Sequence, residues 1–202
     1  MRSKTEERRQ VILEAATQAF QEIGYEHCSM SEITARAGGS KATVYNYFAS
    51  KAELFAAVML RAAGDISHAY EALTPGEDVS SALRVFGRRL LPLVLAEPVV
   101  STLRMALKEA ARSEVGRVFY EAGPKVGWIR MADFLDDAMA RGQLRRADAW
   151  VASMHLRSLL EAEHFMQRLL GVCEPPTKKQ VEVAVDRALD VFMAAYGVAA
   201  PR

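Results

Sequence analysis

Residues Ser40–Phe55, SKATVYNYFASKAELF, decide how this chain is interpreted. The stretch holds two short segments, and each begins with a serine. A glycine pair, Gly38 and Gly39, comes directly before it, and a short amphipathic segment opening at Ser29 comes before that pair. Serine ahead of an apolar-periodic run is a typical helix N-cap. Helix, glycine turn and short polar helix, in that order, predict a helix-turn-helix over residues 29–48.

Apolar residues at helical spacing continue on both sides of this unit and predict an all-α chain of about nine helices, with no convincing strand. Gly24 is expected to end the first helix, and Pro92 to kink or end the fifth. The predicted helices cover residues 5–23, 29–37, 40–47, 50–73, 78–96, 98–112, 124–141, 148–170 and 177–197.

The composition is that of an ordinary globular protein: 202 residues, half of them apolar, with a formal net charge of +1. The net charge by itself does not indicate nucleic acid. The N-terminus is charged and carries no apolar signal region. The longest apolar stretch, Leu90–Val100, is broken by prolines and is too short to span a bilayer. We therefore expect a cytoplasmic protein that is not inserted in a membrane.

The two cysteines, Cys28 and Cys173, lie far apart and show no metal-ligand spacing. The simplest interpretation is two unpaired thiols in a reducing compartment. Because Cys28 lies just ahead of a helix start, which can lower the pKa of a thiol, a redox role for Cys28 is the alternative interpretation.

The short helix after the glycine turn has a core side and a polar side. Val44 and Phe48 are expected to face the core. On the other side, lysine can donate to guanine in the major groove and alanine can contact a thymine methyl group. Hydroxyl groups and helix starts suit phosphate oxygens. The residues predicted to contact DNA on these grounds are Lys41, Ala42, Thr43, Tyr45, Tyr47 and Lys51.

The segment Arg9–Phe55 resembles the N-terminal domain of TetR-family transcriptional regulators. The C-terminal half more loosely resembles the AefR-like branch of that family. The residues that carry the N-terminal resemblance are Ile12, Ala15, Ala16, Phe20, Gly24, Ile33, Ala37, Gly38, Ser40, Thr43, Tyr45, Tyr47, Phe48, Lys51, Leu54 and Phe55.

The resemblance implies a helix-turn-helix domain over residues 6–66 and a helical effector-binding and dimerisation domain over residues 74–202. It adds Ser29, Ser31 and Ser40 to the predicted operator contacts. Two positions depart from the family pattern: Gly39 replaces a small apolar residue, and Thr34 replaces the alanine at the helix crossing. Because glycine adds backbone freedom, Gly39 is expected to loosen the DNA-reading helix.

The predicted helix 148–170 is apolar on nearly all sides, and the last helix carries an apolar stripe. A helix of that kind must be buried on nearly all sides, which predicts packing against a second subunit. A two-fold dimer would present two reading helices to successive major grooves of a palindromic operator. The resemblance implies the same four-helix interface. The predicted interface residues are Met154, Phe165, Leu169, Val185, Leu189 and Phe192.

A pocket for an unknown, largely apolar effector is implied by the resemblance. The apolar candidates for its wall are Phe86, Leu103, Met105, Phe119, Trp128, Met131 and Phe134. The polar candidates are His155, Arg157 and Glu161. The competing interpretation is that aromatic and methionine residues at helical spacing form ordinary core, and that Arg157 and Glu161 pair within one helix.

The sequence therefore predicts a DNA-binding repressor that leaves its operator when a small ligand binds, with no cofactor, no metal and no catalytic residues. A regulator controlled by a partner protein, without an effector, is the first alternative. The second is a helical-bundle metalloenzyme, since Glu161 and His164 form one Glu-x-x-His motif. A di-iron site needs two such motifs and further glutamates, and no second copy is present.

Overall fold

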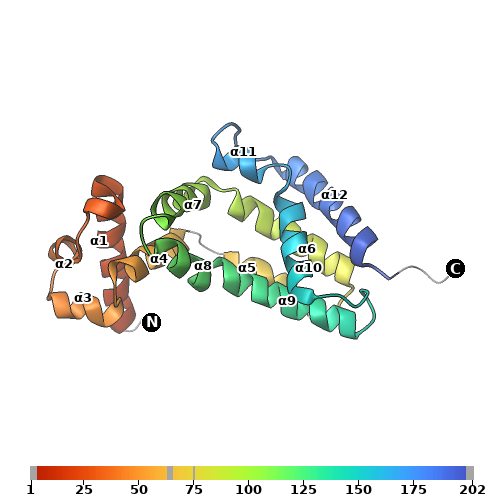
Figure 1. Cartoon of the computed structure of the whole chain (residues 1–202), viewed down its shortest axis with the longest axis horizontal. Coiled ribbons are helices and arrows are strands. Elements are labelled where there is room, and N and C mark those ends of the chain that lie inside the picture. Colours follow the sequence, from red (N-terminus) through yellow and green to blue (C-terminus); the bar gives the residue numbers. More distant parts are fainter. Residues whose placement is uncertain (1–3, 63–65, 75, 199–202) are drawn as a thin grey trace. The chain divides into compact units, whose positions relative to one another are not determined.

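The computed structural model describes residues 4–62, 66–74 and 76–198, with the side chains of Lys4 and Ala62 left out. Nearly all of these residues are helical (Figure 1), and among them β-structure is limited to one antiparallel bridge between Leu144 and Gly197. The all-α prediction is confirmed. Contacts between Cα atoms divide the chain into two compact units, residues 1–62 with 102–123, and residues 63–101 with 124–202.

The first unit contains α1 (Lys4–His27), α2 (Met30–Ala37), α3 (Lys41–Tyr47), α4 (Lys51–Ala62), most of α7 (Glu97–Ala110) and α8 (Val115–Ala122). Helix α1 packs against α2 and α4, and α4 packs against α8. Gly24 breaks the helical path of α1 at φ 79°, as the sequence predicts. Residues 102–123, which the sequence places in the larger domain, thus belong with the N-terminal helices.

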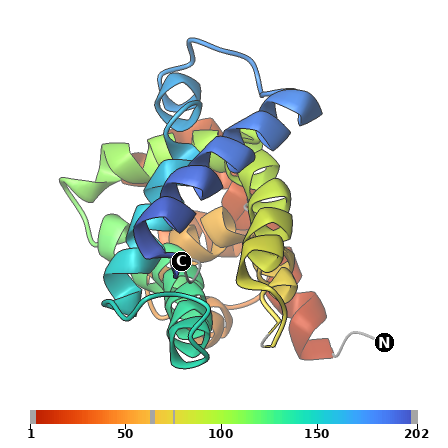
Figure 2. The ribbon, with the colours of Figure 1, turned by 90° about the vertical axis from the view of Figure 1, so that its right-hand side faces the viewer.

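The second unit contains α5 (Ile66–Ala69), the short 3-10 helix η1 (Tyr70–Ala72), α6 (Val79–Val94), α9 (Pro124–Ala140), α10 (Ala149–Glu161), α11 (Phe165–Leu169) and α12 (Lys178–Tyr196). Figure 2 shows α12 running diagonally across α10 and α6, and it packs against both. Gly87 permits this close packing, because a Cβ there would lie 2.9 Å from Val185 Cγ1 and 3.0 Å from Leu160 Cδ2.

One predicted helix is wrong in its extent, and one observed helix was not predicted. The predicted helix 148–170 is interrupted after Glu161 and resumes as α11 at Phe165, so its apolar residues lie on two elements with different orientations. Residues 113–123, to which the sequence assigned no helix, include α8. Pro92 lies inside α6, which ends two residues later at Val94. The predicted helix 50–73 crosses residues 63–65, which lie outside the described residues, and ends in α5 and η1.

Arg168 of α11 holds three segments of the second unit together, and it is only 4% exposed. Its Nε donates to the Leu95 carbonyl at 3.1 Å and its Nη1 to the Cys173 carbonyl at 2.7 Å. Its Nη2 pairs with Glu97 at 2.7 Å. Because a buried guanidinium needs its donors satisfied, this network positions α11 against the junction between α6 and α7.

The predicted dimer interface is wrong for Val185, Leu189 and Phe192, which are 0%, 1% and 0% exposed within a single chain. Their face of α12 is covered by α6 and α10 of the same chain, so it is not available to a partner. The amphipathic stripe identified a buried face correctly, but periodicity does not reveal which helix buries it.

No single helix among the described residues is long and apolar enough to cross a membrane. Helices α6 and α7 pass that test only when they are taken together as a bent pair. The apolar face of α6 lies in the core of the second unit.

Candidate functional site

The helix-turn-helix is built by two serine caps and two glycines. Ser29 Oγ accepts from the Glu32 amide at 3.1 Å, and Ser40 Oγ accepts from the Thr43 amide at 3.1 Å. Between these helix starts, Gly38 and Gly39 have φ values of 73° and 86°, a region that favours glycine. The chain therefore turns sharply between α2 and α3.

The core side of the unit matches the prediction. Val44 of α3 and Phe48, the C-cap of α3, are buried, and Ile33 of α2 is fully buried with them. Thr34 lies at the helix crossing and is 8% exposed. Its hydroxyl donates to the Met30 carbonyl at 2.7 Å, so the threonine that replaces the expected alanine satisfies its own polar group within α2.

Arg8 of α1 holds the turn from the other side. Its guanidinium donates to the Ala37 carbonyl at 3.1 Å and also to the Gly38 carbonyl. These carbonyls lie at the C-terminal end of α2, where helix acceptors lack partners within the helix. Gly39 has a structural reason of its own: a positive φ favours glycine there, and Arg8 packs closely against it.

We predict that Gly39→Ala destabilises the first unit by about 1–2 kcal/mol, because it places a Cβ at φ 86° and 2.7 Å from Arg8 Nη2. Thermal unfolding measures the loss. Ala35→Gly, at an exposed position inside α2, is the matched control and should cost about 1 kcal/mol through helix propensity alone. A Gly39→Ala variant as stable as the parent chain would show that the positive φ is not required.

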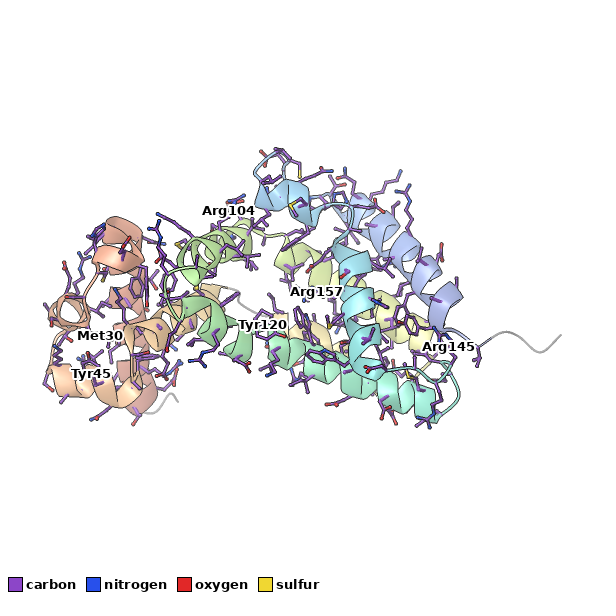
Figure 3. All side chains as sticks on the ribbon, viewed as in Figure 1. Met30, Tyr45, Arg104, Tyr120, Arg145 and Arg157 are labelled. Atoms are coloured by element: carbon purple, nitrogen blue, oxygen red, sulfur yellow. The ribbon has the colours of Figure 1, made fainter. Side chains whose placement is uncertain are left out.

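The side of α3 opposite the core presents a compact polar surface. Lys41, Ala42, Tyr45 and Asn46 are exposed, and Tyr45 is 42% exposed. Figure 3 labels Tyr45 on α3. Lys41 Nζ lies 6.0 Å from the centre of the Tyr45 ring. Asn46 was missed by the sequence reasoning, although at 100° per residue it projects directly opposite the midpoint of Val44 and Phe48. An asparagine amide can read adenine in the major groove through two hydrogen bonds.

Most of the other residues predicted to contact DNA are constrained by hydrogen bonds or by burial. The hydroxyls of Ser40 and Thr43 lie 2.8 Å apart and hydrogen-bond to each other. Ser29 serves as the cap of α2, and Ser31 is exposed on its first turn. Tyr47 is half-buried against the core and lines an open depression together with Arg8 and other residues of α1. The side chains that project most freely are therefore Ser31, Lys41, Ala42, Tyr45 and Asn46.

Lys51 is committed to contacts within the first unit. Its ammonium donates to the carbonyls of Tyr25, Glu26 and Cys28, at 2.7, 3.3 and 2.9 Å. It also lies 4.3 Å from the centre of the Tyr25 ring. An ammonium has three donors, and these carbonyls accept all of them. This geometry contradicts a free phosphate-contacting role for Lys51. The residue instead links the C-terminal end of α1 to the start of α4.

Cys28 is 1% exposed, and burial raises the pKa of its thiol above the ordinary value. The helix start at Ser29 therefore does not produce the lowered pKa on which a redox role depends, because desolvation disfavours the thiolate. Both cysteines are free thiols.

The second unit contains a small cavity among α6, α9, α10 and η1. Its volume is about 10 Å³, enough for about one water molecule. Tyr70 and Phe86 meet edge to face there, with ring centres 5.0 Å apart. Arg157 pairs with Glu161 on the same helix, and their side chains are 20% and 17% exposed. The lining residues are Tyr70, Phe86, Trp128, Met131, Ser153, Leu156 and Arg157.

The structure brings together four of the ten predicted pocket residues, Phe86, Trp128, Met131 and Arg157, with Glu161 beside Arg157. Phe134 belongs to the core of the same unit but does not line the cavity. His155 is exposed, and its Nδ1 lies 2.6 Å from the Tyr196 hydroxyl. Sequence reasoning missed Tyr70, which lies near a helix break where periodicity carries little information.

The remaining predicted pocket residues, Leu103, Met105 and Phe119, belong to the first unit. Met105 and Phe119 pack there against the N-terminal core. The sequence correctly identified apolar residues at helical spacing on α7 and α8. Those residues belong to the first unit, however, and do not line the cavity of the second unit.

The metalloenzyme alternative gains no support from geometry. Among the described residues, no three His, Cys, Asp or Glu side chains gather as a metal site. Glu161 is paired with Arg157, and His164 stands at the break between α10 and α11.

The serine-capped helix pair, the exposed polar face of α3 and the separate helical unit with its own cavity define a helix-turn-helix transcriptional regulator. The chain matches two family models: "Bacterial regulatory proteins, tetR family" over residues 12–58 and "AefR-like transcriptional repressor, C-terminal domain" over residues 81–198. Together these cover most of the chain, and the protein belongs to the TetR family of transcriptional regulators.

Relatives of known structure agree over nearly the whole chain. The "Flavonoid-responsive Regulator FrrA" is 31% identical with a TM-score of 0.83, and the match covers 96% of this chain and 100% of that one. A TetR-family regulator from Mesorhizobium loti is 28% identical with a TM-score of 0.79, covering 98% and 100%.

A curated sequence relative covers much less of the chain. The transcriptional activator FasR from Mycolicibacterium smegmatis is 46% identical over 56 residues, but these span only 28% of this chain and 26% of that protein.

Proposed function

We propose that this TetR-family regulator is a homodimeric repressor that binds a palindromic DNA operator and leaves it when a small, largely apolar ligand binds. The observation that carries the DNA-binding part is the exposed surface of α3, where Lys41, Ala42, Tyr45 and Asn46 are exposed while Val44 is fully buried. This side is free to enter a major groove, because none of these residues is needed for packing.

Repression and ligand release are supported by the relatives. The family model that matches residues 81–198 describes transcriptional repressors. FrrA is described as flavonoid-responsive. The mechanism we propose is a population shift: ligand in the second unit favours a form with lower operator affinity. An activator, as FasR is described, would instead gain operator affinity or recruit the transcription machinery.

Dimerisation is proposed through the exposed side of α10, α11 and α12, in place of the buried residues that the sequence indicated. Met154 is 40% exposed and, of the predicted interface residues, remains available; Phe165 and Leu169 are partly buried. Exposed apolar side chains on or next to these helices support this choice, because large exposed apolar patches mark interaction sites. They are Val151, Met154, Met166, Leu170, Val172, Val183 and Val191.

The direct test selects binding sites from a random duplex pool and footprints the chain on its own upstream DNA. We expect a palindromic site with half-site centres about 34–36 Å apart. Asn46→Ala should relax the preference at one position of each half-site, lowering discrimination there by about 1–3 kcal/mol. Gln18→Ala, an exposed amide on α1, is the control and should leave the selected sequence unchanged. Failure to select any sequence would overturn the proposal.

An in vitro operator-release assay with the purified chain and the selected operator distinguishes ligand control from control by a protein partner. If a small molecule that binds the purified chain also releases the operator, no partner protein is required.

A further inference from the structure

Two polar side chains line the cavity of the second unit next to an ion pair. Tyr70 and Arg157 both belong to the lining, and Arg157 pairs with Glu161 one turn along α10. An i,i+4 ion pair on a solvated helix face contributes only about 0.3–0.5 kcal/mol, and burying such a pair costs desolvation. The placement of this pair beside an aromatic cavity therefore indicates recognition rather than stability.

Tyr70 is held against this pair by the shape of α9. A Cβ at Gly127 would overlap the Tyr70 hydroxyl, so glycine at this position makes room for it. Burial raises the pKa of the Tyr70 hydroxyl, with Arg157 acting in the opposite direction. The hydroxyl thus remains protonated near neutral pH and is able both to donate and to accept.

The rest of the wall is mostly apolar, and its one further polar residue, Ser153, donates its hydroxyl to the Trp150 carbonyl at 2.8 Å. The Phe86 ring lies at 61° to the Tyr70 ring, and the Trp128 ring lies 6.2 Å from Trp150. Met131 and Leu156 close the remaining sides. Aromatic and methionine surfaces of this kind suit a planar ring, which packs by stacked or edge-to-face contact.

In this structure the cavity is nearly filled by its own side chains. Its volume of about 10 Å³ is far below the roughly 150 Å³ of a cavity that holds benzene. An aromatic ligand must therefore displace a ring, and the one-turn element η1 that carries Tyr70 is the smallest element of the wall.

We infer that the cavity takes a neutral hydroxylated aromatic molecule whose ring displaces Tyr70 or Trp128 and whose hydroxyl is shared by Glu161 and Arg157. The inference rests on the proposed function, since it names the chemical class of the effector. A phenolic hydroxyl donates to the Glu161 carboxylate and accepts from Arg157, so both charges stay paired. An aromatic carboxylate would lie beside Glu161, and an aryl ether lacks the donor.

The test compares three probes of similar size: a naphthol, its methyl ether and the naphthoate with the same substitution. Binding is followed by quenching of Trp128 and Trp150 fluorescence and by calorimetry. We expect the naphthol to bind about tenfold tighter than either of the others, which corresponds to about 1.4 kcal/mol. Equal affinities, a preference for the naphthoate, or no binding by any of the three would overturn the inference.

Variants connect that preference to the named groups. Glu161→Gln should remove most of the preference for naphthol over the ether, because the amide is a weaker acceptor than the carboxylate. Asp137→Asn alters the equivalent i,i+4 pair with Arg141, which lies on α9 away from the cavity lining, and should leave the preference unchanged. Tyr70→Phe removes the Tyr70 hydroxyl from the cavity. Its control is Tyr196→Phe, which removes the hydroxyl that contacts His155.

Operator release is measured separately. If the naphthol binds with the expected preference but the operator stays bound, the cavity inference stands and ligand-controlled repression fails. If the probes bind without preference while another small molecule releases the operator, the repressor function stands and the inference on ligand class fails.

Discussion

Replacing Lys51 with methionine is expected to lower the free energy of unfolding of the N-terminal unit by about 2–3 kcal/mol. The variant removes three charge-assisted hydrogen bonds and leaves the carbonyls of Tyr25, Glu26 and Cys28 without their donor. It also removes the cation from the face of the Tyr25 ring. Hydrogen exchange of α1 and α4 amides measures the loss in this unit specifically.

Lys41→Met is the matched control, because Lys41 is an exposed lysine on α3 whose nearest aromatic ring, that of Tyr45, lies 6.0 Å away. It should leave hydrogen exchange unchanged and weaken operator binding. A phosphate contact would show the reverse pattern at Lys51: unchanged stability and a salt dependence of operator binding reduced by about one unit of slope. That result would restore the role that the sequence suggested.

Replacing Phe192 with alanine is expected to destabilise the second unit by about 3–5 kcal/mol. The Phe192 ring is 0% exposed and stacks on Tyr196, with ring centres 4.7 Å apart. It lies among the buried residues of α6, α10 and α12, so its removal leaves a cavity in the centre of the unit. Chemical denaturation followed by circular dichroism measures the loss.

A variant of Val191, the residue next to Phe192, distinguishes a core position from a dimer-interface position. Val191 is 54% exposed and lies about 100° around α12 from Phe192. Val191→Glu should leave the unfolding midpoint of the isolated chain nearly unchanged and weaken dimerisation, as measured by sedimentation. If Phe192→Ala dissociates the dimer while each chain stays equally stable, the original assignment of Phe192 to the interface is correct.

The elements that the sequence predicted well are those specified by neighbours in the chain. Ser29 and Ser40 cap their helices, because a serine side chain reaches the amide three residues on. Gly38 turns the chain because it adopts a positive φ. The burial of Val44 and Phe48 follows from helical spacing alone.

The elements that the sequence did not predict depend on which segments meet in space. Lys51 binds backbone carbonyls rather than phosphate only because the C-terminal end of α1 lies against it. Gly39, which departs from the expected small apolar residue, is favoured because the chain adopts a positive φ there and Arg8 packs closely on it. The break between α10 and α11 leaves Arg168 able to reach Leu95 and Glu97, and no local periodicity encodes that contact.

By itself, the sequence determined the helical class, the helix-turn-helix, its caps and the family, because these follow from short-range spacing over consecutive residues. The tertiary structure decided which apolar faces form core, which remain exposed for a partner, and which polar side chains border the cavity. The physical reason is that a hydrophobic stripe indicates only that a face is buried. The element that covers this face, the carbonyls that bind Lys51, and the Leu95 and Glu97 partners of Arg168 all come from segments distant in the chain.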